Sequence, residues 1–121
     1  MAPMPPTVRT AFEEELRAAT DATDLGDMWR ALERAHILSQ PWPWPHTRSH
    51  WHMLRLALRC RDRKEVLGQV VRLSGAGLGS SLGRVPIGNT GRTAVGIMTP
   101  MPIPADLAAI LEAGCGEAAR R

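Results

Sequence analysis

The chain has 121 residues, of which 44% are hydrophobic and 22% charged, and a formal net charge of +3 at pH 7. This composition excludes wholesale disorder, and the lack of any run of about 18 apolar residues excludes a membrane-spanning helix. Two cysteines are too few for a disulfide framework or a zinc cluster built from cysteine. The basic balance suggests an anionic partner, but a single Phe, no Tyr and no binding motif argue against nucleic acid.

The length fits one domain, so we expect residues 1–121 to form a single helical unit, with residues 1–7 disordered and residues 114–121 frayed. The N-terminus lacks the charged-then-apolar pattern of a secretory signal. We therefore expect a cytoplasmic protein.

Apolar residues at helical spacing predict a first helix over residues 8–23. A second helix is predicted from Asp27, a suitable N-cap, to about Ser39. Proline alternates with tryptophan over Pro41–Pro45, so we expect an extended corner there rather than a helix.

The second half of the chain begins with a third predicted helix over residues 46–61. The segment Asp62–Glu65 has the form of a capping box and opens a fourth helix that reaches about Leu82. Glycine and proline dominate residues 84–104, and a short last helix follows over residues 104–113. Strand signals are nearly absent. The prediction is an all-α fold of three or four packed helices with a Gly/Pro-rich C-terminal strap and a short final helix.

All four histidines lie between positions 36 and 52. At about 100° per residue, helical geometry gives the direction of each side chain relative to the apolar stripe of its helix. His52 points away from that stripe. The polar residues predicted to face inward are Glu15 of the first helix, Glu33 and His36 of the second, and His46 and His50 of the third.

A buried carboxylate without a partner costs several kcal/mol, so an inward set of this kind needs a common partner. Imidazole and carboxylate together suit transition metals. Glu33 and His36 have the i, i+3 spacing of metal sites in helical bundles, and His46 and His50 can bind one ion from one helix face. The sequence therefore predicts a site for iron or zinc, with manganese as a further option. A ferritin-type di-iron centre is not predicted, because the chain has one Glu-x-x-His pair instead of two, but a less symmetric site for one or two metal ions is.

A metal-free polar network is the alternative, with Glu15 paired to an arginine and the histidines bonded to backbone carbonyls. Three functions stay open on these grounds. The protein is a metal-dependent enzyme that activates water or dioxygen on a small-molecule substrate, a module that sequesters or senses a metal, or a metal-free helical interaction protein.

The two tryptophans of the proline-rich corner, Trp42 and Trp44, have three interpretations. They cap the metal site, they form an apolar contact between copies of the chain or with a partner, or they pack a rigid turn onto the helix ends. The sequence does not separate these.

Several segments resemble a family of short bacterial proteins catalogued as a domain of unknown function, over about Phe12 to Leu111. In this chain they are Glu33-Arg34-Ala35-His36-Ile37-Leu38-Ser39-Gln40, His46-x-x-x-His50-Trp51-x-Met53-Leu54, Val66-Leu67-Gly68-Gln69, Arg84 to Gly91, and Pro100 to Pro104. The resemblance implies membership of that family and no particular activity. It also implies that the family's first-helix glutamate falls on Glu15 and its metal-type residues on Glu33, His36, His46 and His50.

Overall fold

The computed structural model describes residues 2–81, 89–93 and 100–121. Within them the chain forms five helices and no strand, which confirms the all-α prediction. The helices are α1 (Pro6–Asp21), α2 (Leu25–Ser39), α3 (Pro43–Cys60), α4 (Arg63–Ser81) and α5 (Ala105–Ala119). Residues 84–88 and 94–99 of the predicted strap lie outside the described residues.

Helix α2 begins earlier than predicted. Its N-cap is Asp24, whose carboxylate accepts a hydrogen bond of 3.1 Å from the backbone N–H of Asp27. Asp27 therefore lies in the first turn, where a negative charge favours the positive end of the helix dipole. The prediction that Asp27 caps this helix is wrong, because two aspartates with equal capping ability stand three residues apart.

Helix α3 begins at Pro43, so the extended corner predicted over Pro41–Pro45 is wrong for its second half. The first turn of a helix has no internal acceptor for its N–H groups, and proline there removes a donor that no carbonyl needs. Trp42 stays extended and is the N-cap. The helix ends where Arg61 adopts a left-handed backbone with φ 54°.

The last two helices confirm one prediction and correct another. Asp62 accepts a 3.1 Å hydrogen bond from the N–H of Glu65, as the capping box predicts. Helix α5 runs to Ala119 rather than ending near Ala113. Contacts with α1 hold this extra length, because Glu117 accepts hydrogen bonds from the backbone and the hydroxyl of Thr7.

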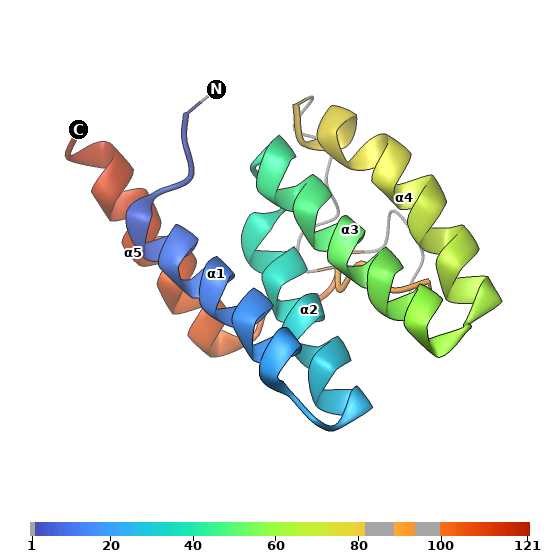
Figure 1. The fold of residues 1–121 in the computed structure, drawn as a ribbon. Helices are drawn as coiled ribbons and strands as arrows, with labels where there is room; N and C mark the ends of the chain where they lie inside the picture. Colours follow the sequence, from blue (N-terminus) through green and yellow to red (C-terminus); the bar gives the residue numbers. More distant parts are fainter. Residues whose placement is uncertain (1, 82–88, 94–99) are drawn as a thin grey trace.

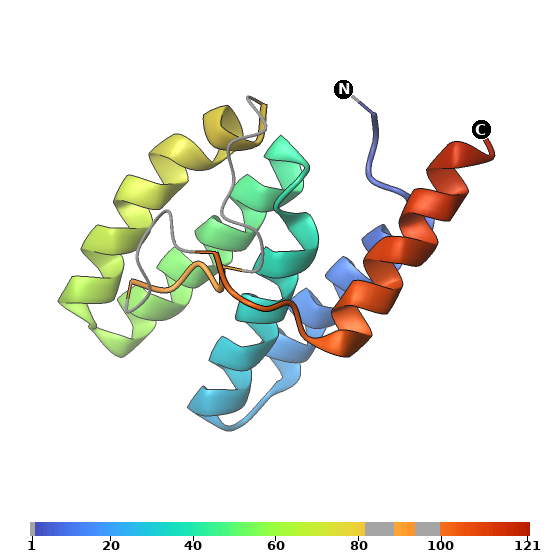
Figure 2. The ribbon, with the colours of Figure 1, turned by 180° about the vertical axis from the view of Figure 1, so that it is seen from behind.

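Figure 1 shows α1 beside α2 and α3 beside α4, with α5 packed along α1 on the side away from α4. In Figure 2 residues 89–93 and 100–104 cross the face of the molecule between α4 and α5. The core between the helices contains fully buried side chains from four of them: Val8, Phe12, Leu38, Met53 and Leu107. None of the helices in the described part of the chain is long and apolar enough to cross a membrane.

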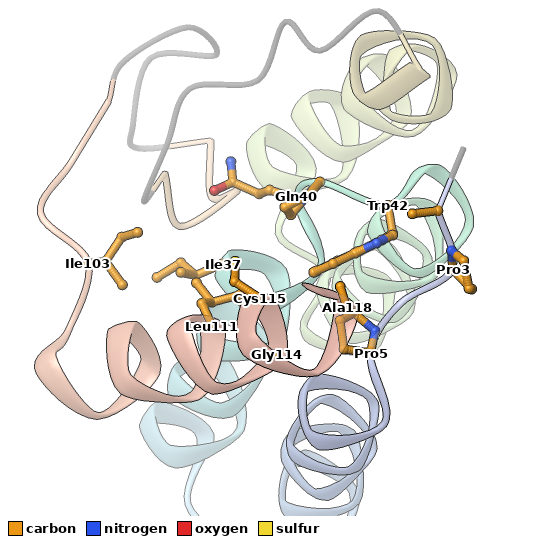
Figure 3. A pocket seen from close by; sticks show the side chains of 12 residues that line it. Pro3, Pro5, Ile37, Gln40, Trp42, Ile103, Leu111, Gly114, Cys115 and Ala118 are labelled. Carbon is orange, nitrogen blue, oxygen red and sulfur yellow. The ribbon is translucent and has the colours of Figure 1, made fainter. Parts of the chain in front are cut away.

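The two tryptophans of the proline-rich corner have different surroundings. Trp42 lines an apolar pocket of about 350 Å³ between α5, the end of α2 and the N-terminal segment, where Ile37, Ile103 and Leu111 also lie (Figure 3). Trp44 is exposed over 70% of its surface. The two side chains therefore do not act as one unit.

Candidate metal centre

Three histidines from two helices meet in the interior. His36 comes from α2, and His46 and His50 come from α3, where they stand one turn apart and share the inward face. They are 3%, 6% and 3% exposed. The Nε2 atom of His36 lies 3.0 Å from that of His46 and 3.1 Å from that of His50. One ring nitrogen from each histidine falls within 4.8 Å of the others, which is close enough for a single metal ion.

The second ring nitrogen of two of these histidines faces a carbonyl oxygen. His36 Nδ1 lies 2.6 Å from the backbone oxygen of Asn89, and His50 Nδ1 lies 2.8 Å from Oε1 of Gln69. A carbonyl oxygen only accepts hydrogen bonds, so both Nδ1 atoms carry the proton and donate. This arrangement fixes the ring orientation, as it does for histidines that bind metals through the other nitrogen.

The orientation of the Gln69 amide follows from its other contacts. Its Nε2 group donates to the backbone oxygen of Gly91 at 2.8 Å and to Oε1 of Glu65 at 3.3 Å. Both partners are acceptors, so the nitrogen of the amide must face them and the oxygen must face His50. Gln69 is fully buried, and these three hydrogen bonds give it a single orientation.

The electrostatics keep the rings of His36 and His50 neutral. Burial lowers the pKa of His36 well below its ordinary value, and the neighbouring His50 and His46 lower it further. Burial likewise lowers the pKa of His50 to about 4, against the hydrogen bond to Gln69. Neutral rings with protonated Nδ1 atoms have lone pairs on Nε2. His36 and His50 thus direct two lone pairs at each other across 3.1 Å, and neither can donate.

A second layer of charged groups holds this arrangement from the α4 side. Glu65 accepts hydrogen bonds from Arg92 Nε at 2.7 Å and from the backbone N–H of Thr93 at 2.9 Å. Burial alone would raise the pKa of Glu65, but these hydrogen bonds outweigh it and leave the pKa lowered. The guanidinium of Arg92 also lies 3.8 Å from the ring centre of Trp29. Glu65 therefore ties residues 92–93 to α4, and Arg92 in turn contacts α2.

Of the five residues predicted from the sequence to bind a metal, the structure brings together His36, His46 and His50. Glu15 instead forms an ion pair of 2.8 Å with Arg34, which also pairs with Asp106. These two pairs tie α1, α2 and α5 together.

Glu33 and His52 are placed outside the histidine cluster. Glu33 lies 3.4 Å from Arg92, and burial raises the pKa of its carboxyl group despite that cation. His52 is half-buried, with its pKa lowered by burial and by Arg48 and Arg55. It lines a groove between α1, α2 and α3 and is not one of the three clustered histidines.

Gly91 fits closely against the cluster. The backbone φ of Gly91 is +85°, a value that residues with a Cβ rarely adopt. A Cβ at this position would lie 2.7–2.9 Å from ring atoms of His36. We expect Gly91→Ala to lower the free energy of unfolding by roughly 1–3 kcal/mol, through backbone strain and displacement of His36. Urea denaturation monitored by circular dichroism measures this.

The matched control is Gly75→Ala in α4, where a Cβ would meet nothing within 4 Å. This change should stabilise the helix by up to about 1 kcal/mol, because alanine is the better helix former. Equal stability losses in the two variants would contradict the close fit of Gly91 against His36.

Comparison with known proteins identifies one relationship. No curated protein and no solved structure matches the chain. A family model described as "Protein of unknown function (DUF3703)" matches residues 6–111, a range that includes His36, His46, His50, Gln69 and Gly91. The chain belongs to this family of unknown function, as the resemblance noted in its sequence predicts.

Proposed function

We propose that this protein binds one transition-metal ion, Zn²⁺, through the Nε2 atoms of His36, His46 and His50. The observation that supports it is the pair of lone pairs on His36 and His50, which face each other at 3.1 Å while both Nδ1 atoms donate to carbonyl oxygens. A proton on His46 could relieve only part of this repulsion, since one N–H serves one acceptor well. A cation between the three nitrogens gives every lone pair a partner.

The donor set favours zinc over the other metals considered. All three candidate ligands are imidazoles, and the carboxylates of Glu65 and Glu33 are engaged by Arg92. Imidazole nitrogens suit zinc, whereas manganese prefers carboxylate and water oxygens. Non-haem iron sites of the oxygenase type add a carboxylate to two histidines, and the group of three contains none.

A metal-dependent enzyme is the second candidate, because three histidines leave one position of a tetrahedral zinc site for an outside ligand. Replacing zinc by Co²⁺ makes this testable through the visible spectrum of the ion. A change in that spectrum on addition of azide supports an open position and a small-molecule substrate. An unchanged spectrum favours a closed site and a sequestering or structural role.

The test of metal binding is elemental analysis by mass spectrometry of untagged protein purified without chelator. We expect about one zinc per chain, in keeping with a single cluster of three ligands. His36→Ala and His50→Ala should each lose the metal, whereas the matched variant His52→Ala should retain it. Iron in place of zinc would overturn the choice of metal. Metal-free protein whose unfolding is unaffected by added Zn²⁺, or equal metal loss in all three variants, would overturn the site itself.

A further inference from the structure

The outward side of α3 presents large apolar side chains to solvent. Trp44, Trp51 and Leu58 are 70%, 51% and 57% exposed. Each follows the previous one by seven positions, which is close to two helical turns, so the three form one stripe along the helix. The histidines occupy the opposite side of α3, and the stripe therefore takes no part in the proposed metal site.

Helix α4, which packs beside α3, exposes apolar side chains of its own. Arg48 pairs with Glu13 at 2.6 Å, so the Arg48 flank of α3 faces α1 and the stripe is turned away from α1. Helix α4 packs along α3 and directs Glu65 and Gln69 inward. Its opposite side exposes further apolar residues. We define the outer face as the stripe of Trp44, Trp51 and Leu58 on α3.

Positive charge is concentrated around this outer face. Residues 43–64 contain six of the fifteen basic residues and one of the twelve acidic residues, so this segment has a net charge of +5 and the rest of the chain −2. Five of the six basic residues are exposed and form no ion pair with any residue that the structure describes: Arg55, Arg59, Arg61, Arg63 and Lys64.

We propose that the outer face binds the surface of an anionic lipid bilayer, with the tryptophans at the level of the headgroups and the surrounding arginines on lipid phosphates. Tryptophan concentrates at the boundary between headgroups and hydrocarbon, and basic residues beside it are attracted to anionic lipids. The protein would lie on the membrane without crossing it.

Charge and side-chain chemistry favour this partner over two others. A second copy of the chain would bring the same unpaired arginines, such as Arg55 and Arg59, close to one another, with a single acidic residue in residues 43–64 of each copy to offset them. A nucleic acid would match the charge and could stack bases on the tryptophans. It would leave Leu58 without an apolar partner, whereas lipid chains supply one.

The experiment is flotation of the full-length protein with lipid vesicles. We expect binding to vesicles of phosphatidylglycerol and phosphatidylcholine in equal parts, a blue shift of tryptophan fluorescence, and little binding to phosphatidylcholine alone. Trp44→Ser/Trp51→Ser and Arg55→Glu/Arg59→Glu should each lower the partition coefficient, the latter by about 30-fold or more. Circular dichroism checks that both variants remain folded.

The matched control is Arg17→Glu/Arg30→Glu, which changes the net charge equally at exposed positions of α1 and α2. It should retain most of the binding, and retention supports a defined face. If this control lost as much vesicle binding as Arg55→Glu/Arg59→Glu, net charge alone would explain the effect and the proposal would be overturned. Three other outcomes would overturn the proposal as well. They are a lack of binding to anionic vesicles, displacement from them by a single-stranded oligonucleotide at equal phosphate concentration, and a dimer in solution that Trp44→Ser/Trp51→Ser dissociates. Zinc content is expected to stay unchanged in every variant, so failure here is distinct from failure of the metal site.

Discussion

Gln69→Leu is expected to lower the free energy of unfolding by roughly 3–5 kcal/mol and to weaken zinc binding by about 10–100-fold. Gln69 is fully buried and makes hydrogen bonds to His50 Nδ1, to the oxygen of Gly91 and to Glu65. Leucine has a similar volume but leaves these groups without that partner. Glu65 keeps its hydrogen bonds from Arg92 and Thr93, so two buried groups lose their partner, and at about 1–3 kcal/mol each they give a range of about 2–6 kcal/mol around the expected loss. The weaker zinc binding follows because His50 loses the group that fixes its tautomer.

Gln69→Glu separates the two effects. A carboxylate can still accept the hydrogen bond from His50, but it cannot donate to Gly91 and it repels Glu65. We therefore expect this variant to lose stability while binding zinc more tightly than Gln69→Leu does. Urea denaturation of the metal-free protein and competition with a zinc-binding dye measure the two quantities. Wild-type zinc affinity in Gln69→Leu would show that Gln69 does not orient His50.

Phe12→Ala is expected to cost about 3–5 kcal/mol of stability without weakening zinc binding in the folded protein. The ring of Phe12 is fully buried in the core on α1, and the guanidinium of Arg48 lies 5.5 Å from its centre. Alanine leaves a cavity that neighbouring helices fill only in part. The three histidines belong to α2 and α3, so their convergence does not depend on this ring.

The same two measurements test Phe12→Ala. The denaturation midpoint should fall while the dye competition under native conditions gives the wild-type affinity. If zinc affinity falls as far as in Gln69→Leu, the site depends on overall packing rather than on its own hydrogen bonds. Because the two variants lose similar stability, they control for each other.

The helical pattern predicts the all-α fold because apolar spacing reports directly on which side of a helix is buried. It locates helix ends less well, as α2 and α3 show. Asp24 and Asp27 both have the chemistry of an N-cap, and the choice between them depends on tertiary packing. Pro43 and Pro45 exclude a helix interior, but the first turn tolerates both.

The same reasoning predicts the direction of His36, His46 and His50, and its metal-free alternative pairs Glu15 with an arginine, but it does not identify which arginine. Glu15 and Glu33 do lie toward neighbouring parts of the chain, but each forms an ion pair there, Glu15 with Arg34 and Glu33 with Arg92. Spacing along one helix gives the side on which a residue lies. It carries no information about which arginine of another element will lie beside that residue.

The helical pattern does not identify the residues that supply the hydrogen-bond partners of the histidines, Gln69 and Asn89. Gln69 follows Glu65 by one turn, which places both on one side of α4, but a glutamine is more often exposed than buried. Asn89 contributes a backbone oxygen, an atom that every residue has, so its identity gives no signal. The motifs around Gln69 and Gly91 pointed to the family, not to these contacts.

The acceptor for His36 belongs to residues 89–93, a stretch between helices that follows His36 by 53 positions. The helical pair α2 and α3 brings the three rings together, but their protonation pattern is complete only after this distant stretch has docked. The rate at which an ion leaves the rings would then depend in part on local opening of residues 89–93. Such an opening costs less free energy than global unfolding. Opening of residues 89–93 would free the ring of His36 to turn, so the residence time of a bound ion would depend on how often these few backbone atoms undock as well as on its bonds to nitrogen.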